Sequence, residues 1–257
     1  MAQLSPGRYY TQIESGAAGL ADLLHSHGAD LHIPTCPEWS MRQLITHVGR
    51  AHRWAAQIVA TRATEVIPFR AVKNGALPAE LPERARWLRG GASLLVDAAR
   101  DAHDEVVWSF IGAVPASFWT RRMAAETLVH LADAQLAAGQ QPVMEPDLAA
   151  DAIDEWVGVM SGPNPGQPDG RAAAMPAGAV LHLHATDPGL AAGEWLIRNS
   201  PEGIVVEPGH GKGDAALTGP AGSLLLVLMR RLPPSDPSVS LFGDPAILTA
   251  WLDSTPF

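Results

Sequence analysis

The segment RRMAAETLVHLADAQ, residues 121–135, is the most informative stretch for the fold of the first part of the chain. Glu126 and His130 are four residues apart in it, so a helix through this segment would point both side chains the same way. A second stretch with helical periodicity, CPEWSMRQLITHVGR at residues 36–50, contains His47. A packed pair of helices could therefore bring one carboxylate and two imidazoles together. That donor set suits a divalent metal with a coordination position left open, which is typical of catalytic metal sites.

The composition limits the classes of protein to consider. The chain has 257 residues, enough for one large domain or two modest ones, and 47% of them are hydrophobic, which excludes disorder as the main state. The net charge is -9, and no basic cluster is longer than the pairs Arg121–Arg122 and Arg230–Arg231, so nucleic-acid binding has little electrostatic support. The single cysteine, Cys36, excludes an internal disulfide and a structural zinc site built on several thiolates.

Targeting and membrane segments are not apparent in the sequence. The N-terminal stretch MAQLSPGRYYTQIESG lacks the charged start and apolar run of a signal peptide. The longest apolar stretch, residues 224–229, is too short to span a bilayer. We therefore expect a soluble cytoplasmic protein whose partners are small molecules, with no nucleic acid and no membrane.

Helical periodicity dominates the first two thirds of the chain. The pattern predicts four long helices, with residues 64–81 irregular and a loop around Gly112 and Pro115. The expected helices cover residues 9–27, 40–60 with Ser40 as N-cap, 82–100 and 117–138. Such a series favours an antiparallel four-helix bundle, in which metal sites are commonly built from inward-facing side chains. With one more helix at 147–160, this bundle is expected to occupy residues 1–160.

The pattern changes after SGPNPGQPDG, residues 161–170, which is rich in Pro and Gly and is expected to be a linker. A smaller domain at residues 171–257 then combines strands and helices, so the predicted fold class is α+β, mainly α. Strands are expected near 179–187, 194–199, 203–209, 214–217 and 239–243, and helices at 223–232 and 245–254. The segment GHGKG, residues 209–213, lacks the spacing of a phosphate-binding loop, and we interpret it as a hairpin turn.

Four motifs together resemble the mycothiol-dependent maleylpyruvate isomerase family, a branch of the DinB-like metal-binding helical bundles. CPEWSMRQLITHVGRAHRW is similar to the family's P-x-W-x-x-x-x-L-x-x-H helix start, and RRMAAETLVHLADAQ to its R-R-M-x-H-E-T-x-V-H-x-x-D-A helix. LHLHATDPGLAAGEWLI and DAALTGPAGSLLLVLMRR resemble strands and a helix of its C-terminal domain, which has a sterol-carrier-like α+β fold. The likeness runs in order across nearly the whole chain.

The resemblance implies a divalent metal, usually zinc, held by His47, Glu126 and His130. It also implies an arginine from the C-terminal domain, either Arg230 or Arg231. One departure is visible, because the histidine that commonly precedes the glutamate is Ala125 here. The ligand set does not include this position, but a contact to a ligand or to the substrate would be missing.

The implied chemistry is the activation of a low-molecular-weight thiol, mycothiol, for cis-trans isomerisation of an unsaturated or electrophilic small acid, or for transfer to it. Arg122 lies four residues before Glu126 and could bind an anion near the metal. Three alternatives stay open: a mycothiol S-transferase in detoxification or natural-product biosynthesis, a hydrolase that uses metal-bound water, and a non-catalytic binding protein. The residue types do not choose zinc over iron, nickel or manganese.

Other side chains near the motifs have ordinary interpretations. His52 is expected to be polar surface and is a weaker candidate for the third ligand. Asp133 could orient His130 or be a surface carboxylate. Cys36 is expected to pack rather than act as a nucleophile. Trp39 and Trp54 are expected to pack in the core or between helices, and the alternative that they form an aromatic wall near the metal stays open.

The pair His182 and His184 is a rival metal signal. An H-x-H on a strand puts both rings on one face of the sheet. The only acidic partner at an obvious distance in sequence is Asp187, so a structural or substrate-facing role is favoured over a second metal.

Overall fold

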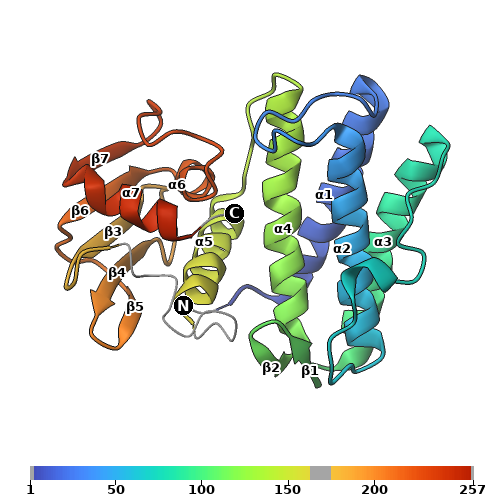
Figure 1. The fold of residues 1–257 in the computed structure, drawn as a ribbon, viewed down its shortest axis with the longest axis horizontal. Coiled ribbons are helices and arrows are strands. Elements are labelled where there is room, and N and C mark those ends of the chain that lie inside the picture. The colour runs from blue at the N-terminus through green and yellow to red at the C-terminus, as the bar shows by residue number, and fades with distance from the viewer. Residues whose placement is uncertain (1–2, 163–174, 256–257) are drawn as a thin grey trace. The chain divides into compact units, whose positions relative to one another are not determined.

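Four long helices form the first of the two units into which the chain divides, Leu4–Val143 (Figure 1). The computed structural model describes residues 3–162 and 175–255. The helices are α1 (Pro6–His27), α2 (Met41–Ala60), α3 (Leu81–Ala102) and α4 (Ser117–Ala137). The four helices predicted from the sequence are confirmed, with bounds that differ by a few residues.

Local residue chemistry explains where these helices begin and end. Ser40 and Gln43 form a capping box at the start of α2, in which the Ser40 backbone N–H donates to Gln43 Oε1 at 2.9 Å. Proline stands in the first turn of α1 and of α3, where its missing N–H costs nothing. The α1 helix ends at Gly28, whose N–H donates to Leu24 O, and α3 ends at His103 in the left-handed region.

Each helix of the bundle packs mainly against two others. Helix α1 lies against α3 and α4, and α2 lies against the same two helices from the other side. Close approach of α2 and α3 requires Gly49, because a Cβ there would lie 2.1 Å from Cζ3 of Trp87. The buried Arg53 guanidinium also ties the pair, donating to Gly49 O at 3.0 Å and to Trp87 O at 2.6 Å. The contacts of α2 with α4 also make direct neighbours of the two helices that carry the predicted ligands.

The expected loop around Gly112 and Pro115 is instead a short antiparallel hairpin. Strand β1 (Val106–Ser109) pairs with β2 (Gly112–Pro115), and Gly112 supplies the positive φ of 115° at the turn. Trp108 on β1 is held by ring contacts with Trp54 and Trp119. Strands this short carry too little alternation for sequence reasoning to detect. Between α2 and α3 a single 3-10 turn, η1 (Phe69–Ala71), lies within the segment expected to be irregular.

The second unit begins at Met144 and combines a sheet with helices (Figure 1). Its strands are β3 (Val180–Ala185), β4 (Glu194–Ser200), β5 (Gly203–Pro208), β6 (Ala215–Gly219) and β7 (Ser240–Gly243), and its helices are α5 (Pro146–Ser161), α6 (Ala221–Leu228) and α7 (Pro245–Ser254). The strand order is β5-β4-β3-β6-β7, and β3 and β6 are parallel while the other neighbours are antiparallel. The mainly α, α+β fold class is confirmed.

Helix α5 belongs to this second unit because its buried face packs against α6 and β5. The sequence pattern had placed the helix at 147–160 with the bundle. The linker predicted at 161–170 lies almost entirely outside the described residues, and it stays a prediction.

Two expectations for the second unit were wrong in detail. Segment 209–213 is not a hairpin turn, because β5 and β6 are not neighbours and the segment crosses β4 and β3 to join them. Helix α6 ends at Leu228, before Arg230 and Arg231, because Arg230 takes a left-handed φ of 60° and the Arg231 N–H turns back to Leu226 O at 2.7 Å. Among the described residues, no helix combines the length and the apolar character that a membrane span requires.

Candidate metal centre

Helices α2 and α4 bring His47, Glu126 and His130 together in the first unit. Glu126 and His130 share one face of α4, and His47 approaches them from the neighbouring α2. Nε2 of His47 lies 2.7 Å from Glu126 Oε1, and Nε2 of His130 lies 3.3 Å from the same oxygen. One ligand-type atom from each residue lies within 4.8 Å of the other two. The three side chains therefore converge on one small volume.

This convergence is surrounded by protein on most sides. The side chains of His130 and Glu126 are 2% and 10% exposed, whereas that of His47 is 30% exposed. The open side of the centre therefore lies at His47. The Trp39 ring contacts both imidazoles, with centroid distances of 5.0 Å to His47 and 5.9 Å to His130, and Phe69 lies 6.1 Å from His47. An aromatic wall thus borders the centre, as one of the two interpretations of Trp39 allowed.

Neighbouring charges keep the carboxylate ionised. Burial alone would raise the pKa of Glu126, but Arg122 and hydrogen bonds from both histidines hold that pKa well below its ordinary value. Arg122 Nη2 lies 2.5 Å from Glu126 Oε2, on the carboxylate oxygen that faces away from the imidazoles. Arg122 therefore already binds one anion, Glu126.

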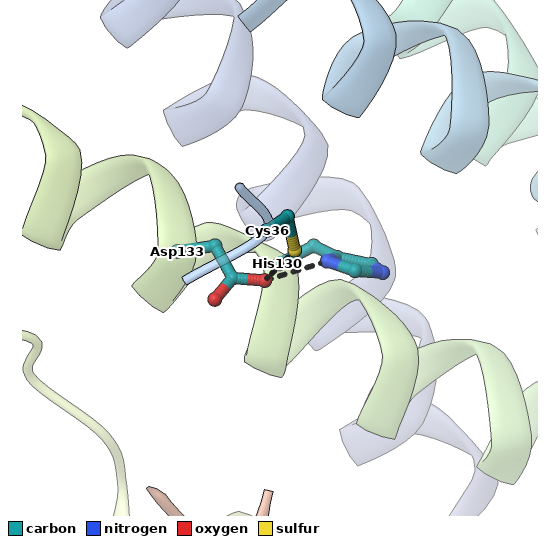
Figure 2. Close-up of side chains that lie close together, drawn as sticks. All are labelled: Cys36, His130 and Asp133. Atoms are coloured by element: carbon teal, nitrogen blue, oxygen red, sulfur yellow. Dashed lines mark hydrogen bonds and ion pairs between the residues drawn. The ribbon is translucent and has the colours of Figure 1, made fainter. Parts of the chain in front are cut away.

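Asp133 fixes the orientation of His130 (Figure 2). Its carboxylate is fully buried and accepts from His130 Nδ1 at 2.8 Å through Oδ2, while Oδ1 accepts from the Thr35 hydroxyl at 2.6 Å. Although burial lowers the pKa of His130, hydrogen bonds to Asp133 and Glu126 outweigh it and raise that pKa to about 9. The orienting interpretation of Asp133 is confirmed, and the surface alternative is not.

Cys36 lies beside the same carboxylate rather than among the three convergent atoms. Its Sγ donates to Asp133 Oδ2 at 3.8 Å (Figure 2). Cys36, His130 and Asp133 thus form a second possible group of ligands that shares His130 with the first. In this second group His130 would have to use Nδ1, the nitrogen that Asp133 already occupies, so the first group is the better candidate.

His52 is not polar surface, contrary to the expectation. It is fully buried, and its Nε2 lies 2.8 Å from Thr127 Oγ1, which itself donates to Met123 O. Five residues after His47, its ring points along a different direction of α2 and meets α4 one residue beyond Glu126. His52 therefore braces the two helices behind the centre and does not join it.

The two C-terminal arginines lie in the second unit, after α6. Arg230 donates to Leu252 O and lies 3.8 Å from Asp253, and its side chain is 42% exposed. Arg231 is buried and donates to Met229 O at 2.6 Å. Both side chains thus bind groups of their own unit.

The donor chemistry fits a divalent metal. When neutral His130 donates from Nδ1 to Asp133, its Nε2 carries the lone pair and faces Glu126 Oε1, and Nε2 of His47 faces the same oxygen. The contacts of both Nε2 atoms with Oε1 are hydrogen bonds when these nitrogens carry protons, and a divalent metal that replaced those protons could bind all three atoms. Two imidazole nitrogens and one carboxylate oxygen are a set found in catalytic zinc sites, and a buried carboxylate behind one histidine is the usual outer support.

Comparison with known proteins gives matches over most of the chain. Residues 11–135 match the model of the mycothiol maleylpyruvate isomerase N-terminal domain, and residues 147–250 match that of the C-terminal domain of the same enzyme family. Among solved structures, the chain is similar to the mycothiol-dependent maleylpyruvate isomerase and to a histidine-to-alanine mutant of it, each with a TM-score of 0.58 and 14% identity over 94% of this chain and 95% of that one. No curated protein matches the sequence.

Proposed function

The chain belongs to the mycothiol-dependent maleylpyruvate isomerase family, and on that premise we propose that it is a metal-dependent enzyme that activates a small thiol, mycothiol, for reaction with an unsaturated or electrophilic small acid. The observation that carries the proposal is the approach of His47 Nε2 and His130 Nε2 to one oxygen of Glu126. A bound divalent metal, with zinc the first choice, would supply Lewis acidity that lowers the pKa of a thiol in its open position.

The residues of this chain have distinct roles in that proposal. His47, Glu126 and His130 hold the metal, and Asp133 keeps the Nε2 lone pair of His130 directed at it. Together the three ligands contribute one negative charge, so the loaded centre stays positive and favours an incoming thiolate. The exposed edge at His47 is where the thiol and the acid would enter.

The substrate acid also needs an attractive charge near the thiol. Arg122 lies on the same face of α4 as Glu126, and its side chain is 14% exposed. Arg122 also pairs with Glu126, but a metal bound to Glu126 would share that negative charge, so the guanidinium would be able to attract a carboxylate arriving at the centre. We propose Arg122 for this role, and the family pattern separately implies a catalytic arginine in the C-terminal domain, either Arg230 or Arg231.

Two outcomes are open to the activated thiolate. In isomerisation the sulfur adds to an alkene carbon of the acid, the former double bond rotates, and expulsion of the thiolate restores the alkene in its trans form. In transfer the carbon–sulfur bond persists, and the product is an S-conjugate. The first outcome returns the thiol and the second consumes it.

A thiol titration with maleylpyruvate as substrate tests the proposal. We expect trans product only when both mycothiol and metal are present. Glu126→Gln should lower the rate at least about 100-fold, because loss of a direct ligand costs no less than loss of an outer partner. Glu83→Gln, at an exposed position of α3, should leave the rate unchanged. Thiol recovered unchanged identifies an isomerase, and thiol consumed in proportion to product identifies a transferase. Equal rates with and without thiol would refute the proposal, as would full activity after removal of all metal.

A further inference from the structure

A second convergence of histidines lies in the second unit, on one face of the sheet. His182 and His184 alternate on β3 with Leu181 and Leu183, so the two leucines enter the core and both imidazoles lie on the opposite face. The two rings are stacked with their centroids 5.8 Å apart. A strand thus presents two nitrogen ligands side by side, as the H-x-H pattern indicated.

The acidic partner missing from the sequence comes from the next strand. Glu194, the first residue of β4, pairs directly with His184 in the antiparallel register, so its side chain lies on the histidine face. Its Oε2 lies 2.9 Å from His182 Nε2. Glu194 lies ten positions after His184 along the chain. Sequence spacing alone therefore did not indicate that the two residues are strand partners.

A third imidazole arrives from the crossover that joins β5 to β6. His210 Nδ1 lies 2.8 Å from the same Glu194 Oε2, and the His210 ring centroid is 5.5 Å from that of His182 and 6.4 Å from that of His184. The Gly209 N–H donates to Glu194 O at 3.0 Å, which anchors the start of the crossover to β4.

Glycines allow this crossover to lie directly on the histidine face. A Cβ at Gly211 would lie 2.6 Å from Leu196 Cδ1, and one at Gly213 would lie 3.0 Å from His182 Cβ. Gly209 has a φ of 120°, which a side chain would disfavour. The GHGKG segment is therefore shaped to hold His210 over His182 and Glu194 rather than to bind phosphate.

We propose that His182, Glu194 and His210, with His184 beside them, bind a divalent transition metal of the zinc class. One ligand-type atom from each of the first three lies within 4.8 Å of the others. Imidazole-rich sites with one carboxylate favour zinc, nickel or copper over magnesium or calcium, which prefer oxygen. His182 is buried while His210 is 77% exposed, so an ion can enter from solvent. Once bound to both histidines, the ion would hold the crossover against the sheet.

Zinc binding by the full-length chain tests this proposal. The His47→Ala background weakens the first centre, and the proposal does not depend on the function of that centre. Equilibrium dialysis against Zn²⁺ with elemental analysis should show that His47→Ala/His210→Ala binds one equivalent less than His47→Ala, or binds that equivalent at least about tenfold more weakly. Loss of a direct ligand should cost no less than the 10- to 100-fold typical of an outer-shell partner.

Two controls separate a built site from incidental histidine binding. His47→Ala/His25→Ala removes an exposed histidine of α1 outside the cluster and should bind as His47→Ala does. Glu194→Gln should reproduce the loss seen with His210→Ala, and Zn²⁺ should slow proteolysis within residues 209–213 only when His210 is present. Equal zinc binding with and without His210, or an equal loss from His25→Ala, would overturn the proposal.

Discussion

Replacement of Asp133 by asparagine should weaken zinc binding at the first centre by about 10- to 100-fold, or about 1.4–2.7 kcal/mol. Asp133 is fully buried and accepts from His130 Nδ1 and from Thr35 Oγ1. Asparagine has the same size and keeps one acceptor oxygen for His130, while its amide can donate to the Thr35 hydroxyl. The main loss is therefore the negative charge that makes His130 a better ligand, and not a packing defect.

Competition between the protein and a chelator of known zinc affinity measures this effect. The measurement belongs in the His210→Ala background, so that only the first centre is counted. Asp97→Asn on the exposed face of α3 is the matched control and should leave the affinity unchanged. Thermal unfolding should show that Asp133→Asn is folded. An affinity within twofold of the parent would refute the orienting role of Asp133.

Three further outcomes are expected. Gly49→Ala should destabilise the bundle by about 1–3 kcal/mol in urea unfolding, because the new methyl group collides with Trp87, whereas Gly90→Ala on α3, with its nearest atom 3.9 Å away, should not. Burial lowers the pKa of His52 from 6.5 to about 3. Between these two pH values the unfolded chain binds a proton at His52 and the folded chain does not. Stability should therefore fall as the pH drops below 6.5, by about 2 kcal/mol at pH 5, and His52→Gln should remove this component. Cys36→Ala should keep the dependence of the reaction rate on added mycothiol, because the attacking sulfur is that of the added thiol.

Helices α1, α2 and α3 were predictable because their apolar positions repeat over several turns and each begins at a proline or a capping box. Helix α4 begins without either, and only the loop before it and Gly139 after it marked its ends. The strands of the second unit were predictable because apolar residues recur along them at every second position. The hairpin at 106–115 was not, since four-residue strands carry almost no period, and its position is fixed by ring contacts of Trp108 that no local pattern encodes.

Residues of the site were predictable only where their spacing along one helix fixes the direction of their side chains. Glu126 and His130 follow from one helix, and His47 from a second helix supported by the family resemblance. Thr35 was not assigned to the centre, because a loop brings it there from far along the chain. For Trp39, a place beside the centre was only the second of two interpretations. Glu194 and His210 were missed because strand register and a crossover, not sequence distance, place them beside His182.

Proton release on mycothiol binding shows whether the metal centre binds the thiol as a thiolate. Mycothiol is titrated at pH 7 into the zinc-loaded chain by calorimetry in buffers of different ionisation enthalpy, which counts the protons exchanged. A free thiol with a pKa near 8.5 is mostly protonated at this pH, so binding as thiolate should release close to one proton per mycothiol. Glu126→Gln should release none. Tight binding of mycothiol to the parent chain without proton release would mean that the centre does not convert the thiol to a thiolate.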